Sequence, residues 1–194
     1  TKCSFAKHSA LRVTDLPMKL FVATGDLQQS TISFRNVTSA TSVTLGPVLQ
    51  LDDSSAVLFK NCTMDSVEFI DIPLRGTSYI DADELVVTTG GVRLNNVSAD
   101  ATDVRFRNSL LESTYTQYGS VYENALRLID CTFENGAQLL LEDSVVRAYL
   151  TAIQLYAVRN DTYHGKFQHS SYWNTFITGA LFTVTNSAMQ SRYG

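Results

Sequence analysis

Carboxylates are the side chains in this 194-residue chain whose number and spacing could do chemistry. Hydrolysis of a glycosidic bond needs two of them, one as acid and the other as base or nucleophile. Asp81 and Asp83 are two residues apart, so a strand would place both on one face, where an acid from another strand could pair with them. With Glu142 they are our catalytic candidates for a polysaccharide hydrolase or lyase. The competing interpretation is a solvated strand face.

Two aromatic segments could bind sugars. Residues 112–122 are polar, contain three tyrosines and end in a turn signal, which predicts a loop that leaves the scaffold. The segment 149–194 is rich in aromatic residues and predicts terminal coils or a cap. Tyr and Trp rings stack on the apolar faces of sugars, but the same density of rings also suits closure of an open end or a subunit contact. The binding candidates are Tyr115, Tyr118, Tyr122, Tyr163, Tyr172 and Trp173.

Histidines and cysteines do not form a metal-binding pattern. The chain holds His8, His164, His169, Cys3, Cys62 and Cys131. None of the cysteines forms a close pair, and the only neighbouring histidines are five residues apart, which suits neither a strand face nor one helix face. We expect no metal and no cofactor, and we expect the cysteines to be small buried side chains.

A repeated phrase shows what positions these residues. It consists of an apolar residue, a variable residue, Asn or Asp, and a small residue, as in Phe34-Arg35-Asn36-Val37 and Phe59-Lys60-Asn61-Cys62. Asn and Asp tolerate left-handed backbone angles and bond their own chain at turns. Between the phrases, apolar and polar residues alternate with the period of half-buried strands. The expected turn ladder consists of Asn36, Asn61, Asn96, Asn108, Asp130, Asp143 and Asn186.

These phrases predict an all-β solenoid. The chain resembles the right-handed parallel β-helix, pectate-lyase-like superfamily, whose members include phage tailspikes and surface adhesins, in phrases such as Phe59-Lys60-Asn61-Cys62-Thr63-Met64. Several small residues of the phrase are 22 to 26 residues apart, as Val37 and Cys62 are, which predicts coils of about 22–26 residues. The resemblance does not extend to the active-site motifs of polygalacturonases or pectate lyases, which are not found here in order. Because members range from enzymes to passive structure, the fold alone does not give the function.

Composition narrows the class of protein. With 194 residues, of which 44% are hydrophobic and 18% charged, a single domain over 1–194 is expected. The net charge of −4 disfavours nucleic acid as a partner. No apolar run approaches the roughly 20 residues of a membrane-spanning helix, so we expect no membrane insertion. Because the chain starts at Thr1, we expect a processed part of a longer protein, located extracellularly or on a virion surface.

Four sequons could accept glycans in a eukaryotic secretory route. Three coincide with the repeated phrase, where Asn serves the turn, so Asn160 is the glycosylation candidate.

The sequence thus favours a structural and receptor- or glycan-binding domain of a viral tailspike, fibre or surface adhesin. We expect a homotrimer and a surface polysaccharide or other glycan as its partner. A polysaccharide hydrolase or lyase with acids on neighbouring coils is the alternative, and a passive coat or shaft segment is a further one.

Overall fold

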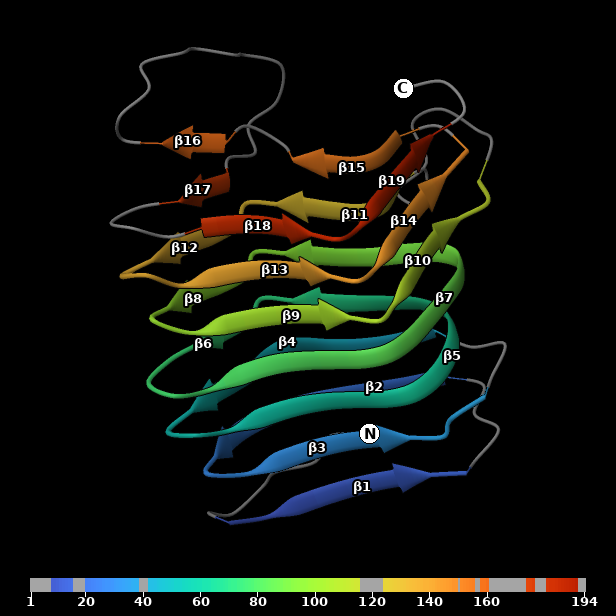
Figure 1. Ribbon diagram of the computed structural model, residues 1–194. Coiled ribbons are helices and arrows are strands. Elements are labelled where there is room, and N and C mark those ends of the chain that lie inside the picture. The colour runs from blue at the N-terminus through green and yellow to red at the C-terminus, as the bar shows by residue number, and fades with distance from the viewer. Residues whose placement is uncertain are drawn as a thin grey trace.

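A computed structural model describes residues 8–15, 20–38, 42–115, 124–149, 151–155, 158–160, 174–176 and 181–191. In this part of the chain the protein is all-β, with no helix, and therefore none long and apolar enough to cross a membrane (Figure 1). The strands are β1 (Ala10–Thr14), β2 (Leu20–Gln28), β3 (Thr31–Arg35), β4 (Ser42–Asp52), β5 (Ala56–Ile70), β6 (Pro73–Leu74), β7 (Tyr79–Asn95), β8 (Ser98–Asp100), β9 (Asp103–Arg107), β10 (Leu110–Ser113), β11 (Asn124–Ile129), β12 (Thr132–Glu134), β13 (Gln138–Glu142), β14 (Val145–Ala148), β15 (Thr151–Leu155), β16 (Val158–Asn160), β17 (Asn174–Phe176), β18 (Leu181–Thr185) and β19 (Ala188–Ser191).

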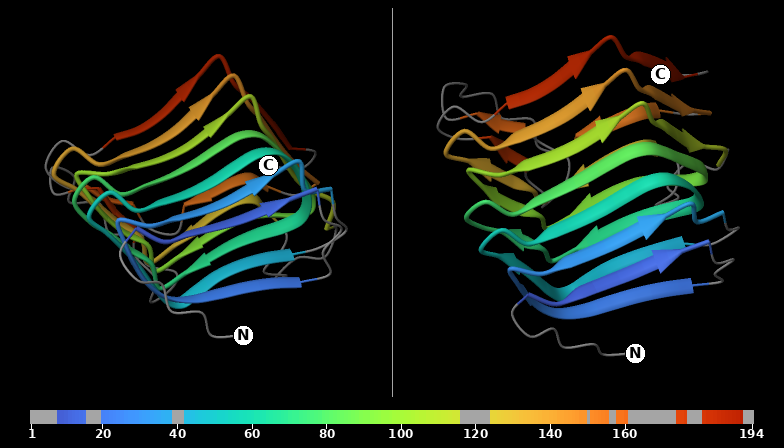
Figure 2. Two further views of the ribbon diagram at one scale, coloured as in Figure 1. Left: turned by 90° about the horizontal axis from the view of Figure 1, so that it is seen from below. Right: turned by 60° about the horizontal axis from the view of Figure 1, so that its bottom comes forward.

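The strands pair in parallel and form long runs of neighbours. The first run consists of β1, β3, β5, β7, β9, β13 and β18, and Figures 1 and 2 show it rising from blue to red. The second run consists of β5, β7, β10, β14 and β19. Two further runs complete the network, one through β2, β4, β5, β7, β11 and β15 and one through β2, β4, β6, β8, β12, β17 and β16. The long strands β5 and β7 bend and contribute to more than one run.

Equivalent residues of neighbouring strands recur at regular distances along the chain. Asn36 and Asn61 are bonded neighbours 25 residues apart, and Asp83 is paired with Arg107, 24 residues further along the chain. The separation grows to 35 between Ser109 and Ser144 and to 43 between Arg147 and Gln190. Residues 116–123 and 161–173, outside the described part, fall within these longer intervals. The sequence predicts a loop over 112–122, but the first two of these residues, Glu112 and Ser113, belong to strand β10.

The core is made of columns, by which we mean side chains at equivalent positions of successively paired strands. The register of the first run places Phe34, Phe59, Ala82, Phe106 and Leu141 in one such column, and all five are buried. The rings of Phe34 and Phe59 stack with centroids 4.8 Å apart. Since side chains alternate between the two faces of a strand, the residues next to these column members point to the opposite face and form columns of their own.

Left-handed residues mark the corners, where most strands end and where the long strands β5 and β7 continue. All seven residues of the expected turn ladder have φ between 47° and 53°. They fall into two corners: Asn36, Asn61, Asn108, Asp143 and Asn186 follow the first run, whereas Asn96 and Asp130 follow the run through β11.

Each corner is closed by two kinds of hydrogen bond to the next strand. The backbone N–H of Asn36 donates to the Lys60 carbonyl at 3.1 Å, and that of Asn108 to the Glu142 carbonyl at 3.0 Å. Side chains add a second ladder, in which Asn61 Nδ2 donates to Asn36 Oδ1 at 3.0 Å. Because the left-handed residue turns its N–H toward the neighbouring strand, the corner also sets the register.

Two glycines with positive φ offer a matched test of close packing at the corners. At Gly91 (φ 66°) a Cβ would lie 2.3 Å from the Asn124 carbonyl oxygen, whereas at Gly136 (φ 81°) it would meet nothing within 4 Å. Both Gly→Ala changes carry the cost of a left-handed residue, about 1–2 kcal/mol. We expect Gly91→Ala to lower the free energy of unfolding by roughly 3 kcal/mol or more and Gly136→Ala by about 1 kcal/mol, measured by urea denaturation. Equal losses would contradict the packing at Gly91.

Candidate functional site

The catalytic candidates lie together on the outward face of the first run. Asp81 and Asp83 project from β7 on the same side, while Ile80 and Ala82, which alternate with them, are buried. Glu142 lies two strands further along, because Asp83 is paired with Arg107 and Arg107 with Glu142. A basic residue therefore stands between the acids of this column.

Each of the two β7 acids is paired with polar neighbours. Arg107 donates from Nη2 to Asp81 Oδ2 at 2.7 Å and from Nε to Asp81 Oδ1 at 3.2 Å. This bonding raises the pKa of Arg107, assisted by the negative charges of Asp81, Asp83 and Glu142. Asp83 accepts from Asn108 Nδ2 at 2.9 Å and faces Lys60 Nζ at 3.9 Å. The expected pairing of acid with acid is not what the register produces, since the nearest charged partners are Arg107 and Lys60.

Most of the aromatic candidates lie outside the described residues. These are Tyr118, Tyr122, Tyr163, Tyr172 and Trp173. Tyr115 is described, follows β10 and is 38% exposed. Asn160, the glycosylation candidate, ends β16, and only its backbone is described.

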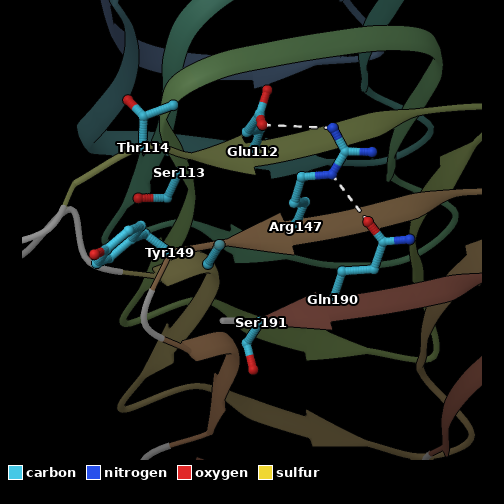
Figure 3. Close-up of a pocket in the computed structure, with 8 residues that line it drawn as sticks. Glu112, Ser113, Thr114, Arg147, Tyr149, Gln190 and Ser191 are labelled. Carbon is cyan, nitrogen blue, oxygen red and sulfur yellow. Dashed lines mark hydrogen bonds and ion pairs between the residues drawn. The ribbon is translucent and has the colours of Figure 1, made fainter. Parts of the chain in front are cut away.

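A groove of about 340 Å³ opens on the outer side of the second run, where β10, β14 and β19 end. Glu112, Arg147 and Gln190 line it from three adjacent strands, because the register pairs Glu112 with Arg147 and Arg147 with Gln190. Thr114 and Tyr149 lie at its other side (Figure 3). The side chains that line the groove are Glu112, Ser113, Thr114, Arg147, Ala148, Tyr149, Gln190 and Ser191.

The three polar side chains of the groove hold one another in place. Arg147 Nε donates to Gln190 Oε1 at 3.0 Å, and Arg147 Nη1 lies 3.7 Å from Glu112 Oε1. The Arg147 side chain remains 48% exposed and that of Glu112 25%. The row therefore presents donors and acceptors to solvent in a fixed order, with carboxylate, guanidinium and amide side by side.

An apolar column lies beside this polar row. Leu110, Val145 and Ala188 occupy the outward positions two residues earlier on the same strands. Leu110 and Val145 are half-buried, and Ala188 is exposed. Planar polar groups next to an apolar strip and a Tyr ring are the usual components of a site for small polar ligands with apolar faces, such as sugars.

Metal-binding geometry is not found within the described residues, since no group of three or more His, Cys, Asp or Glu side chains comes together there. Cys62 and Cys131 are buried, and each directly follows a left-handed corner residue. Both thiols donate to backbone carbonyls, Cys62 to Lys60 at 3.3 Å and Cys131 to Leu94 at 3.3 Å. Cys3 lies outside the described residues.

Comparisons with known proteins add no relative: no protein-family model, no curated protein and no solved structure matches this chain.

The bond between Asp81 and Arg107 should act as a surface ion pair in stability. Because the Arg107 side chain is 38% exposed, the pair is screened by solvent and we expect a coupling of about 1 kcal/mol or less. The measurement is a double-mutant cycle with Asp81→Asn and Arg107→Gln, followed by urea denaturation at low and high salt. The coupling should shrink as salt rises. A coupling well above 1 kcal/mol, or one that does not change with salt, would contradict a solvent-screened surface pair.

The buried cysteines should resist thiol reagents until the chain unfolds. Burial raises the pKa of Cys131 to about 12 and also raises the pKa of Cys62. An unfolded thiol has a pKa of about 8.5. Between this pH and about 12 the thiol ionises in the unfolded chain but stays neutral in the folded protein, so the free energy of unfolding is highest below pH 8.5 and falls as the pH rises toward 12. In a Cys3→Ser background, we expect no labelling of the folded protein at pH 8 and two thiols in urea. Rapid labelling without urea would contradict the burial.

Proposed function

We propose that this chain is a structural and glycan-binding domain built on a right-handed parallel β-helix. Parallel neighbours that recur about 25 residues apart, with left-handed residues at matching corners, support the solenoid. Connections between parallel strands are right-handed in nearly all proteins, which supports the handedness.

The observation that carries the binding function is the groove row of Glu112, Arg147 and Gln190. Sugar hydroxyls both donate and accept, so they need acceptors and donors in alternation, and this row supplies them from a rigid set of strands. The Tyr149 side chain and the apolar column of Leu110 and Val145 supply contact for the C–H faces of a sugar ring. The alternative, a hydrolase or lyase, has less support because Asp81 and Asp83 are engaged with Arg107 and Lys60.

The setting that we propose is an extracellular fibre, spike or adhesin, with the domain as a homotrimer. A stack of parallel strands with a continuous core is a stiff shaft, and the low charged fraction of 18% suits an exported protein. Light scattering gives the number of copies in solution.

A glycan panel with one groove variant and one matched control tests the proposal. We expect Arg147→Ala to reduce affinity for the best-bound glycan about tenfold or more, because it removes the central donor of the row. Arg35→Ala, an exposed arginine on the first run, should bind like the unchanged protein. Thermal melting of both variants should stay within a few degrees of the original.

Two results would contradict the proposal. If Arg147→Ala bound as tightly as the original protein, the groove would not be the site. If no glycan of the panel bound at all, the passive shaft segment would be the better account of the chain.

A further inference from the structure

The groove row is the end of a longer polar column on the second run. The register of β7 shifts between Leu111 and Ser113 of β10 and between Met64 and Ser66 of β5, so Thr88 and Thr89 of β7 together lie at the level of Glu112 and of Asp65. The Thr88 hydroxyl contacts Asp65 Oδ1 at 3.5 Å and the Met64 carbonyl at 3.3 Å. We call this column of five residues the polar track: Asp65, Thr88, Glu112, Arg147 and Gln190.

A second column accompanies the polar track, and it is apolar from β7 to β19. Thr63, Val86, Leu110 and Val145 are paired in sequence across β5, β7, β10 and β14, and all four are half-buried. Ala188 of β19 continues the column and is exposed. The second run therefore presents a polar column and, beside it, a column that is apolar on four of the five strands.

The spacing of the track suits a chain of sugar rings. Neighbouring strands lie about 4.8 Å apart, which is close to the length that one pyranose ring adds to an extended polysaccharide. A linear chain that crosses the strands can therefore place one ring over each strand, with hydroxyls toward the polar track and C–H faces toward the apolar column.

The charges of the track select against acidic chains. Glu112 and Arg147 form an ion pair. Asp65 has the Thr88 hydroxyl as neighbour, and no basic side chain of the described residues lies within ion-pair distance of it. The track thus carries one uncompensated negative charge, on a chain whose net charge is −4. A uronic or sialic acid carboxylate over Asp65 would be repelled.

On this basis we propose that the ligand is an uncharged, linear polysaccharide that lies across β5, β7, β10, β14 and β19. This inference rests on the proposed function, because it assigns the ligand class and the direction of binding to the same groove. The Arg147 end anchors the chain, and Thr88 and Asp65 extend the contact by two further rings.

A series of oligosaccharides of increasing length tests the direction of binding. The probes are neutral gluco-, manno-, galacto- and rhamno-oligosaccharides from dimer to hexamer, measured by isothermal titration calorimetry against the corresponding uronate oligomers. We expect the affinity of the best neutral series to rise about tenfold or more from dimer to pentamer and then to level off. An affinity that does not change with length, or tighter binding of the uronates, would overturn the proposal.

Asp65→Asn tests the charge selection without touching the anchor. The change removes the charge but keeps the shape of the side chain, so binding of uronate pentamers should rise about twofold to fivefold while neutral dimers bind as before. Asp103→Asn on the first run, where Asp103 is paired with Arg105, is the matched control and should change neither. If Asp65→Asn left uronate binding unchanged, the charge selection would be wrong. If no oligosaccharide bound the original protein, the proposed function itself would fail first.

Discussion

The left-handed corner residue is the constraint on which the other features of the structure depend. At each such corner the residue reverses the usual backbone angle, and its N–H then reaches the carbonyl of the neighbouring strand, as between Asn108 and Glu142. An unpaired buried N–H would be costly, so the corner can close only if the strands are in register. Asn and Asp meet this requirement best, because they tolerate the conformation and their side chains bond along the corner.

Register at the corners converts sequence position into chemistry at the surface. A residue a fixed number of positions from the corner falls into the same column on every strand. On the first run this places Arg107 in the column of Asp83, from which its guanidinium reaches Asp81 diagonally, and such ion pairs across strands stabilise a sheet modestly. On the second run the same rule brings Glu112, Arg147 and Gln190 together, and the result is a groove. The outward faces of the first and second runs therefore differ in the side chains that they present, but their strands are paired by the same rule.

The repeated phrase made the corners predictable, because their backbone chemistry depends on local residue type. Glu84 and Ala101 also adopt left-handed angles, and because Glu and Ala do not favour this conformation, their residue types gave no sign of it. The two-residue spacing of Asp81 and Asp83 correctly gave a shared face, but not their basic partners. Those depend on which strand lies next, and a count along the sequence does not provide this.

The groove was missed for a different reason, although a signal was present. Glu112, Arg147 and Gln190 each follow the Asn or Asp of a repeated phrase by four residues, so aligned phrases would have grouped them. Their separations of 35 and 43 residues disguise this order.

Insertions between these strands leave the groove intact because the corners restore the register after each one. Ser109 N–H donates to Ser144 Oγ at 3.1 Å, and Ser144 N–H to Ser187 Oγ at 3.0 Å. These serines directly follow the left-handed residues Asn108, Asp143 and Asn186 and immediately precede β10, β14 and β19, which carry the groove side chains three positions after each serine. The length of the intervening segments therefore has no effect on where Glu112, Arg147 and Gln190 meet. A scaffold of this kind can hold a fixed row of side chains while the chain between its strands varies freely, and that is the property a rigid binding surface requires.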